Sequence, residues 1–190
     1  MKNKKGLIIA LAVIAVIVIF AGSIVSSYNS LVDERETVTN AQANIQTMLQ
    51  RRADLIPNLV NTVKGYAAHE EEVYTAIADA RSKLSGATTV DEMEKANTEL
   101  DSAISRLLVV VENYPELKAD TQFINLQDEL AGSENRISVA RKDYNDVAKA
   151  YNTHIKKFPA NIIASMFNFE QAEYFEASSE AQTAPSVNFD

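Results

Sequence analysis

The chain has 190 residues and a formal net charge of -8, with no Cys and no Trp. It is 46% hydrophobic and 23% charged, which is the composition of a globular protein and excludes a disordered or collagen-like one. The absence of Cys excludes disulfides, thiolate metal sites and a Cys nucleophile, and the acidic balance argues against a general nucleic-acid binder.

The N-terminal segment has the pattern of a membrane anchor. Three lysines precede residues 6–25, which hold no charged side chain and, as a helix, would rise about 30 Å, the thickness of a bilayer core. Two alternatives stay open: a cleaved signal peptide with a small-residue site at Ala21-Gly22-Ser23, and a buried helix of a soluble protein. The lysines place residues 1–5 in the cytoplasm, so that a single-pass protein would expose the rest to the periplasm or the cell surface of a bacterium.

Beyond this segment, apolar residues recur at spacings of three and four, which predicts helices in an all-α fold. Pro and Gly divide the region into four predicted helices, at residues 28–53, 55–84, 90–114 and 121–158. Heptad-like apolar stripes and short connections favour an antiparallel up-and-down four-helix bundle with coiled-coil packing. The break before Pro57, with Asp54 as the N-cap, is the weak point, because Pro57 could instead kink one long helix and leave three.

Three polar residues occupy positions on the apolar stripes: Arg52, Glu70 and His154. Such residues usually form polar contacts that set the helix register, because a buried charge needs a partner. A second hypothesis for Arg51 and Arg52 is contact with an anionic partner, as an alternative to an ion-paired helix junction involving Asp54. For His154, the second hypothesis is that titration of its imidazole makes the packing between helices at this position sensitive to pH.

No catalytic or metal-binding motif is present. Neither His69 nor His154 has a carboxylate three residues before it, which a di-metal helical bundle requires. The sequence also has no G-x-S-x-G elbow and no Gly-rich phosphate loop. We therefore expect no enzyme activity, no metal and no cofactor.

The segment after Pro159 combines apolar and aromatic residues with an absence of Lys and Arg. Exposed aromatic and Met side chains can anchor a partner, so the candidate partner-binding residues are Met166, Phe167, Phe169, Tyr174 and Phe175. Alternatively, these side chains fold back on the end of the last long helix. Residues 176–190 have the composition of a disordered tail.

Four motifs in order resemble the LemA family, from the membrane span to about Phe175. They are Arg51-Arg52-Ala53-Asp54-Leu55-Ile56-Pro57-Asn58-Leu59-Val60, Glu112-Asn113-Tyr114-Pro115, Glu134-Asn135-Arg136-Ile137 with Asp143-Tyr144-Asn145, and Met166-Phe167-Asn168-Phe169. One departure is the lack of a Trp that many relatives carry near Gln42. The resemblance implies a short N-terminal tip, one membrane span and a LemA-like helical region over residues 28–175. It implies no agreed biochemical activity, although some members are linked to organising specialised bacterial membranes.

These observations favour a membrane-anchored envelope protein with a non-catalytic scaffold or interaction role. Its partners would be the membrane, through residues 6–25, and other envelope proteins or a second copy of itself, but no nucleic acid. The alternative is a ligand-sensing helical-bundle ectodomain that acts with a partner signalling subunit, because residues 1–5 are too short to signal alone. An envelope enzyme is a third, weaker alternative.

Overall fold

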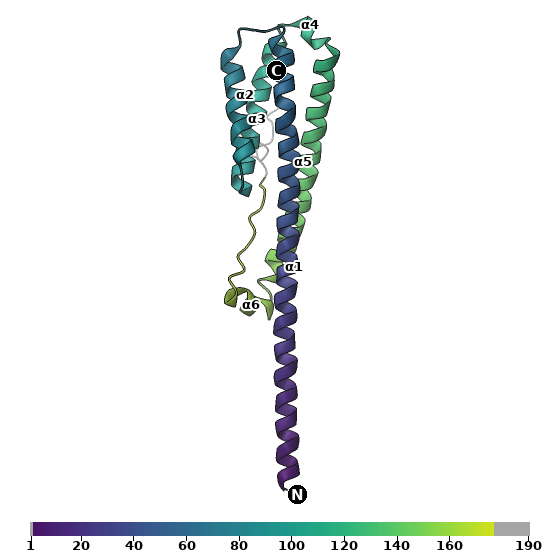
Figure 1. The fold of residues 1–190 in the computed structure, drawn as a ribbon, viewed down its shortest axis with the longest axis vertical. Coiled ribbons are helices and arrows are strands. Elements are labelled where there is room, and N and C mark those ends of the chain that lie inside the picture. The colour runs from purple at the N-terminus through teal and green to yellow at the C-terminus, as the bar shows by residue number, and fades with distance from the viewer. Residues whose placement is uncertain (1, 177–190) are drawn as a thin grey trace, which may run out of the picture. The chain divides into compact units, whose positions relative to one another are not determined.

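A computed structural model describes residues 2–176, and the tail predicted to be disordered therefore lies almost wholly outside the described residues. Within that range the fold is all-α and contains no strand, which confirms the predicted class. Figure 1 shows the helices α1 (Lys2–Lys64), α2 (Glu71–Gly86), α3 (Val90–Val111), α4 (Pro115–Lys118), α5 (Thr121–His154) and α6 (Ala160–Met166).

The described chain divides into two compact units. The first unit contains residues 2–40 and 146–172, and the second contains residues 41–145 and 173–176. The first therefore holds the N-terminal part of α1, the end of α5 and all of α6. The second holds the rest of α1 and α5, together with α2, α3 and α4.

The predicted helix break before Pro57 is wrong, because α1 continues through Pro57 to Lys64. A proline has no N–H to donate to the carbonyl four residues earlier, which here belongs to Ala53. Arg81 of α2 supplies that donor from its Nε at 2.9 Å. Asp54 accordingly is no N-cap; its side chain accepts a hydrogen bond from Gln50 at 2.9 Å. The predicted helix 55–84 is in fact two segments, separated by residues 65–70.

The starts of α3 and α5 follow local capping signals. The predicted break between residues 84 and 90 is confirmed, since α2 ends at Gly86 and α3 starts at Val90. Thr89 accepts from the Glu92 N–H at 3.2 Å, and Glu92 accepts from the Thr89 N–H at 3.1 Å. This reciprocal pair is a capping box. Asp120 caps α5 by accepting from the N–H groups of Gln122 and Phe123 at 2.8 and 3.0 Å. The predicted starts at residues 90 and 121 are thus confirmed.

The core of the second unit draws apolar side chains from α1, α2, α3 and α5. The large buried side chains of this core include Ile45, Ile56 and Leu59 of α1, Ile77 of α2, Met93, Leu100 and Leu107 of α3, and Phe123, Ile137 and Tyr144 of α5, and Leu117 of the short α4 is buried with them. Lys83 and Glu99 add an exposed ion pair between α2 and α3 at 2.6 Å. The predicted stripes therefore face this core, as their spacing requires.

The first unit contrasts a packed part with an unpacked apolar part. Leu31 and Val38 of α1 are buried, as are Tyr151 of α5 and Ile163 of α6. The large apolar side chains described between Leu7 and Phe20, by contrast, are 53% to 72% exposed. Among the described helices, α1 alone is long and apolar enough to cross a membrane, judged by length and composition, with a mean hydropathy of 2.4 in its best window.

Candidate functional site

A buried polar network in the second unit is centred on Arg52, whose residue is only 4% exposed. Its Nη1 donates to Asn97 Oδ1 at 2.7 Å and to Glu134 Oε2 at 2.6 Å. Its Nη2 pairs with Asp101, and Asn97 Nδ2 also donates to Asp101 at 3.0 Å. One guanidinium therefore joins α1, α3 and α5.

These contacts within the chain compensate the buried charge of Arg52. Two carboxylates and one amide oxygen surround the guanidinium, and each carboxylate side chain remains about 40% exposed (42% and 39%). A planar guanidinium with several donors suits such a junction better than a lysine would. Sequence reasoning placed Arg52 at an ion-paired junction but missed Asp101 and Glu134, since the partners lie 49 and 82 residues away. Asn97 was recognisable as a polar residue on the apolar stripe of α3.

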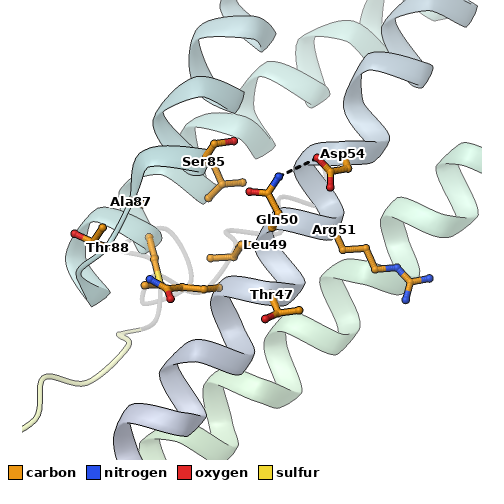
Figure 2. Close-up of a pocket in the computed structure, with 11 residues that line it drawn as sticks. Thr47, Leu49, Gln50, Arg51, Asp54, Ser85, Ala87 and Thr88 are labelled. Carbon is orange, nitrogen blue, oxygen red and sulfur yellow. Dashed lines mark hydrogen bonds between the residues drawn. The ribbon is translucent and has the colours of Figure 1, made fainter.

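Arg51 lies next to this network in the chain but is exposed. It lines a hollow of about 650 Å³ together with Gln50 and Asp54 of α1 and with Ser85 and Thr88 at the connection from α2 to α3. Figure 2 shows the Arg51 guanidinium extending away from Gln50 and Ser85. Of the two adjacent arginines, Arg51 therefore presents its charge to the surroundings.

In the first unit, His154 at the end of α5 meets Glu34 of α1, with 2.8 Å between Nδ1 and Oε1. Both side chains are about one-third exposed (33% and 35%). The other carboxylate oxygen of Glu34, Oε2, is buried without a hydrogen-bond partner. His154 thus has a carboxylate neighbour that the sequence pattern did not indicate, and its pH response stays a prediction.

Within residues 2–176, no three His, Asp or Glu side chains are arranged to hold a metal ion. The carboxylates around Arg52 already share a guanidinium, and the His154 cluster has one carboxylate.

The five candidate partner-binding residues after Pro159 fall into two groups. Rings of Phe167 and Phe169 pack on Tyr28 with centroids 4.8 and 5.7 Å away, and Phe175 is buried with its ring edge-on to Tyr144 at 5.3 Å. Met166 and Tyr174 are 69% and 44% exposed. Phe169 therefore packs on α1 and Phe175 packs within α5, not on the end of the last long helix as the fold-back interpretation predicted. Met166 and Tyr174 are exposed, and their contact with a partner stays a prediction.

Two asparagines of α5 hold the main chain that follows α6, a feature that the sequence analysis missed. In the first unit, Asn152 exchanges two hydrogen bonds with the N–H and C=O of Ala172, both at 2.8 Å. In the second unit, Asn145 does the same with Phe175, at 3.0 and 2.8 Å. Tyr151 and Tyr144, the preceding residues, donate to the carbonyls of Glu170 and Glu173. A Tyr-Asn pair repeated after seven residues was the available signal.

Comparison with known proteins decides the family. The sequence model of the LemA family matches residues 41–189, which is more than three quarters of the chain. The chain belongs to the LemA family. The resemblance seen in the motifs is thereby confirmed, and the matched region includes Arg52, both Tyr-Asn pairs and α6.

Three relatives show similarity over most of this chain. Magnetosome protein MamQ 2 of Paramagnetospirillum magneticum is 28% identical over 94% of this chain and 76% of its own length. Magnetosome protein MamQ of Magnetospirillum gryphiswaldense is 25% identical over 93% of this chain and 74% of its own. Protein LemA of Metamycoplasma hominis is 29% identical over 79% of this chain and 69% of its own.

Proposed function

We propose that this LemA-family chain is a membrane-anchored protein of the bacterial cell envelope with a non-catalytic scaffold or interaction role. The observation that carries the proposal is the apolar stretch of α1, whose described large side chains are more than half exposed between Leu7 and Phe20. A soluble monomer rarely leaves such a surface in water. A bilayer core would cover it, because 20 helical residues match its thickness.

Charge supports one orientation for this anchor. Lys2, Lys4 and Lys5 precede residues 6–25, while Asp33, Glu34 and Glu36 follow them. Under the positive-inside rule, residues 1–5 stay in the cytoplasm and the helical region over residues 28–175 lies in the periplasm or outside the cell. The protein would then be a single-pass membrane protein.

The second unit supplies the platform in this proposal. We propose that α2, α3 and the second-unit parts of α1 and α5 form an up-and-down four-helix bundle. The Arg52 network supports this by tying α1, α3 and α5, and the contact of Arg81 with Ala53 supports it by tying α2 to α1. A bundle tied through buried polar groups is rigid enough to present side chains to a partner.

Exposed side chains of the second unit suit contacts with other envelope proteins or with a second copy. Arg51 offers a cation and Tyr174 an aromatic ring, and both residue types are enriched in protein interfaces. Relatives that carry the name magnetosome protein support a role in a cellular assembly. Nucleic acid is a poor partner for a chain with a net charge of -8.

One observation favours a second candidate, a ligand-sensing ectodomain that acts with a signalling subunit. The hollow of about 650 Å³ beside Arg51 has the size of a small-molecule site and contains amide, hydroxyl and charged groups. A ligand that raises the melting temperature of the natural chain but not of the Gln50→Ala variant would favour this candidate over a scaffold.

Alkaline carbonate extraction of bacterial membranes tests the anchor. We expect the natural chain to stay in the membrane pellet, and the Ile14→Arg, Ile17→Arg double variant to be extracted, because an arginine opposes insertion at the centre of a helix by about 2.5 to 3.5 kcal/mol. The matched Ile14→Leu, Ile17→Leu variant should stay in the pellet. Extraction of the natural chain would contradict the anchor, and a mature protein that lacks residues 1–23 would establish a cleaved signal instead.

Crosslinking in intact cells, followed by mass spectrometry, tests the scaffold role. Specific partners of the natural chain that are lost in the Arg51→Ala, Tyr174→Ser variant, and kept in the Lys95→Ala variant, would support it. Recovery of the same abundant bystanders from all three chains would contradict it.

A further inference from the structure

Helix α6 and its flanks present an apolar surface to the surroundings. Phe158 is 80% exposed, Ile162 53% and Met166 69%, and Phe167 is also half exposed. Ile162 and Met166 are four residues apart within α6, the spacing that places helical residues on one face, and Phe158 lies in the turn that precedes the helix. The twelve residues from 158 to 169 contain no charged side chain. This surface therefore lacks the charged side chains of an ordinary solvent-facing helix, although Asn161 and Ser165 are exposed on it.

The same helix is firmly packed on its other face. Ala160, Ile163 and Ala164 are buried, and Phe169 N–H donates to the Ala164 carbonyl at 2.9 Å. Asn168, with a positive φ of 55°, turns the chain directly after α6 so that Phe169 reaches Tyr28. The packing of its other face therefore holds α6 in place, with its apolar face exposed, within the first unit. An apolar partner that can adapt to Phe, Ile and Met side chains would cover this face.

The position of α6 along α1 indicates that the partner is the membrane surface. Phe167 and Phe169 pack on Tyr28, which lies three residues beyond Val25 and therefore about 4.5 Å along the helix axis from the end of the apolar stretch. Figure 1 shows α6 beside α1, with the N-terminal stretch of α1 running on beyond it. If residues 6–25 cross the bilayer, Tyr28 and α6 lie at the level of the lipid headgroups, where aromatic side chains are favoured.

Charge next to α6 fits a lipid surface as well. Lys156 and Lys157 are exposed and immediately precede Phe158. Basic residues beside an apolar helical face are the pattern of helices that lie in the membrane interface and attract anionic lipids.

We propose that α6, with Phe158 before it and Phe167 after it, lies in the headgroup region of the bilayer and forms a second membrane contact beside the transmembrane span. This inference rests on the proposed membrane anchor. The span fixes the depth of the chain, and α6 then fixes its tilt and rotation, because two contacts at different points on the membrane leave less freedom than one. The first unit is accordingly held against the lipid surface.

Tryptophan fluorescence tests this contact, since the natural chain contains no Trp. Full-length Met166→Trp, Val18→Trp and Thr39→Trp variants are each inserted into vesicles of phosphatidylcholine and phosphatidylglycerol. The phosphatidylcholine carries bromine either near the headgroup or near the end of the acyl chain, and bromine quenches Trp by contact. Val18 is an exposed residue of the apolar stretch. Thr39 is an exposed residue about 17 Å further along α1 than Tyr28 and is the matched control.

We expect the fluorescence of the Met166→Trp variant to fall by about half or more with bromine near the headgroup and less with bromine near the chain end, as for a side chain buried about 5 to 10 Å into the boundary. The Val18→Trp variant should be quenched most by deep bromine, and the Thr39→Trp variant by neither. Quenching of the Val18→Trp variant without quenching of the Met166→Trp variant would overturn the second contact and leave the anchor intact. A Val18→Trp variant that escapes quenching would overturn the anchor itself.

Discussion

Arg81 donates from its Nε to the main-chain carbonyl of Ala53 at 2.9 Å, and this carbonyl is the one that Pro57 leaves without a helical donor. The contact explains how α1 passes through a proline without ending. It also joins α2 to α1. Pro57 weakens the helix locally, but it thereby frees the Ala53 carbonyl to accept a hydrogen bond from a different helix. The predicted break was wrong because the donor that replaces the missing N–H belongs to Arg81, 28 residues beyond Ala53 in the chain.

A double-mutant cycle measures this relationship. Arg81→Ala should lower the free energy of unfolding by about 1.5 kcal/mol, the low end of the range for a hydrogen bond from a charged donor, because the Arg81 side chain is 41% exposed. In a Pro57→Ala background the loss should be smaller, because the introduced alanine supplies the missing N–H. Chemical denaturation of the chain in detergent gives both values, with exposed Arg106→Ala as the control. Equal losses in the two backgrounds would show that Arg81 and Pro57 act independently.

The Arg52 network should be the most sensitive polar feature of the second unit. Arg52→Met leaves Asp101 and Glu134 without their shared cation, and we expect a loss of about 3 kcal/mol, at the low end for a buried ion pair because both carboxylates reach water. Arg51→Met is the matched control and should change stability by less than about 0.5 kcal/mol, as surface substitutions usually do.

Neutralising both carboxylates provides the second arm of this experiment. Arg52→Met combined with Asp101→Asn and Glu134→Gln should recover part of the lost stability, since no uncompensated charge remains. A combined variant that is less stable than Arg52→Met alone would contradict the role given to the network.

The cap of α5 predicts an acid-sensitive contribution to stability. The Phe123 N–H, and with it the Tyr66 hydroxyl and the Gln122 N–H, donates to Asp120 and lowers the pKa of its carboxyl below the usual value, although partial burial opposes this shift. A group with a lowered pKa in the folded state stabilises the fold above its unfolded pKa and loses that contribution as the pH falls through the folded pKa. The window for Asp120 therefore lies below about pH 4.

Asp120→Asn separates capping from titration, because Asn also caps helices but carries no charge. The drop in melting temperature between about pH 5 and pH 2.5 should be smaller in this variant than in the natural chain. An identical drop in both chains would mean that the Asp120 carboxylate adds nothing beyond a neutral acceptor.

Asn145 should control the order of the segment after Ala172 in the second unit. Its amide satisfies both the N–H and the C=O of Phe175, so Asn145→Ala leaves two main-chain groups without partners. We expect amide hydrogen exchange at Phe175 to accelerate about tenfold, which corresponds to about 1.4 kcal/mol. Asn161→Ala, an exposed change on α6, is the control. Unchanged exchange at Phe175 in the Asn145→Ala variant would contradict this role.

The sequence predicted the features that depend on near neighbours. The starts of α3 and α5 were predicted at residues 90 and 121, and near neighbours cap both helices, Thr89 with Glu92 for α3 and Asp120 for α5. Features that depend on distant partners were missed, among them the rescue of Pro57 by Arg81, the two carboxylates around Arg52, and the pairing of His154 with Glu34. A pattern along one helix shows which face is buried, but it does not show which residue of another helix lies opposite.

The aromatic segment shows the same division. Its composition indicated a surface that either binds a partner or folds back. The structure buries Phe175 and leaves Met166 exposed, and partner binding by Met166 stays a prediction. Contacts such as that of Asn152 with Ala172 hold this segment through main-chain groups. Every residue carries these groups, so the residue type at position 172 did not reveal the contact.

The membrane span is the central claim, and cysteine accessibility along α1 tests it most directly, since the natural chain contains no Cys. Single variants Val18→Cys and Thr39→Cys are treated in intact and in opened cells with a maleimide that does not cross membranes. We predict that Thr39→Cys is labelled from outside intact cells, and that Val18→Cys reacts only after detergent dissolves the bilayer. Labelling of Val18→Cys in opened cells as readily as Thr39→Cys would contradict a membrane-spanning α1.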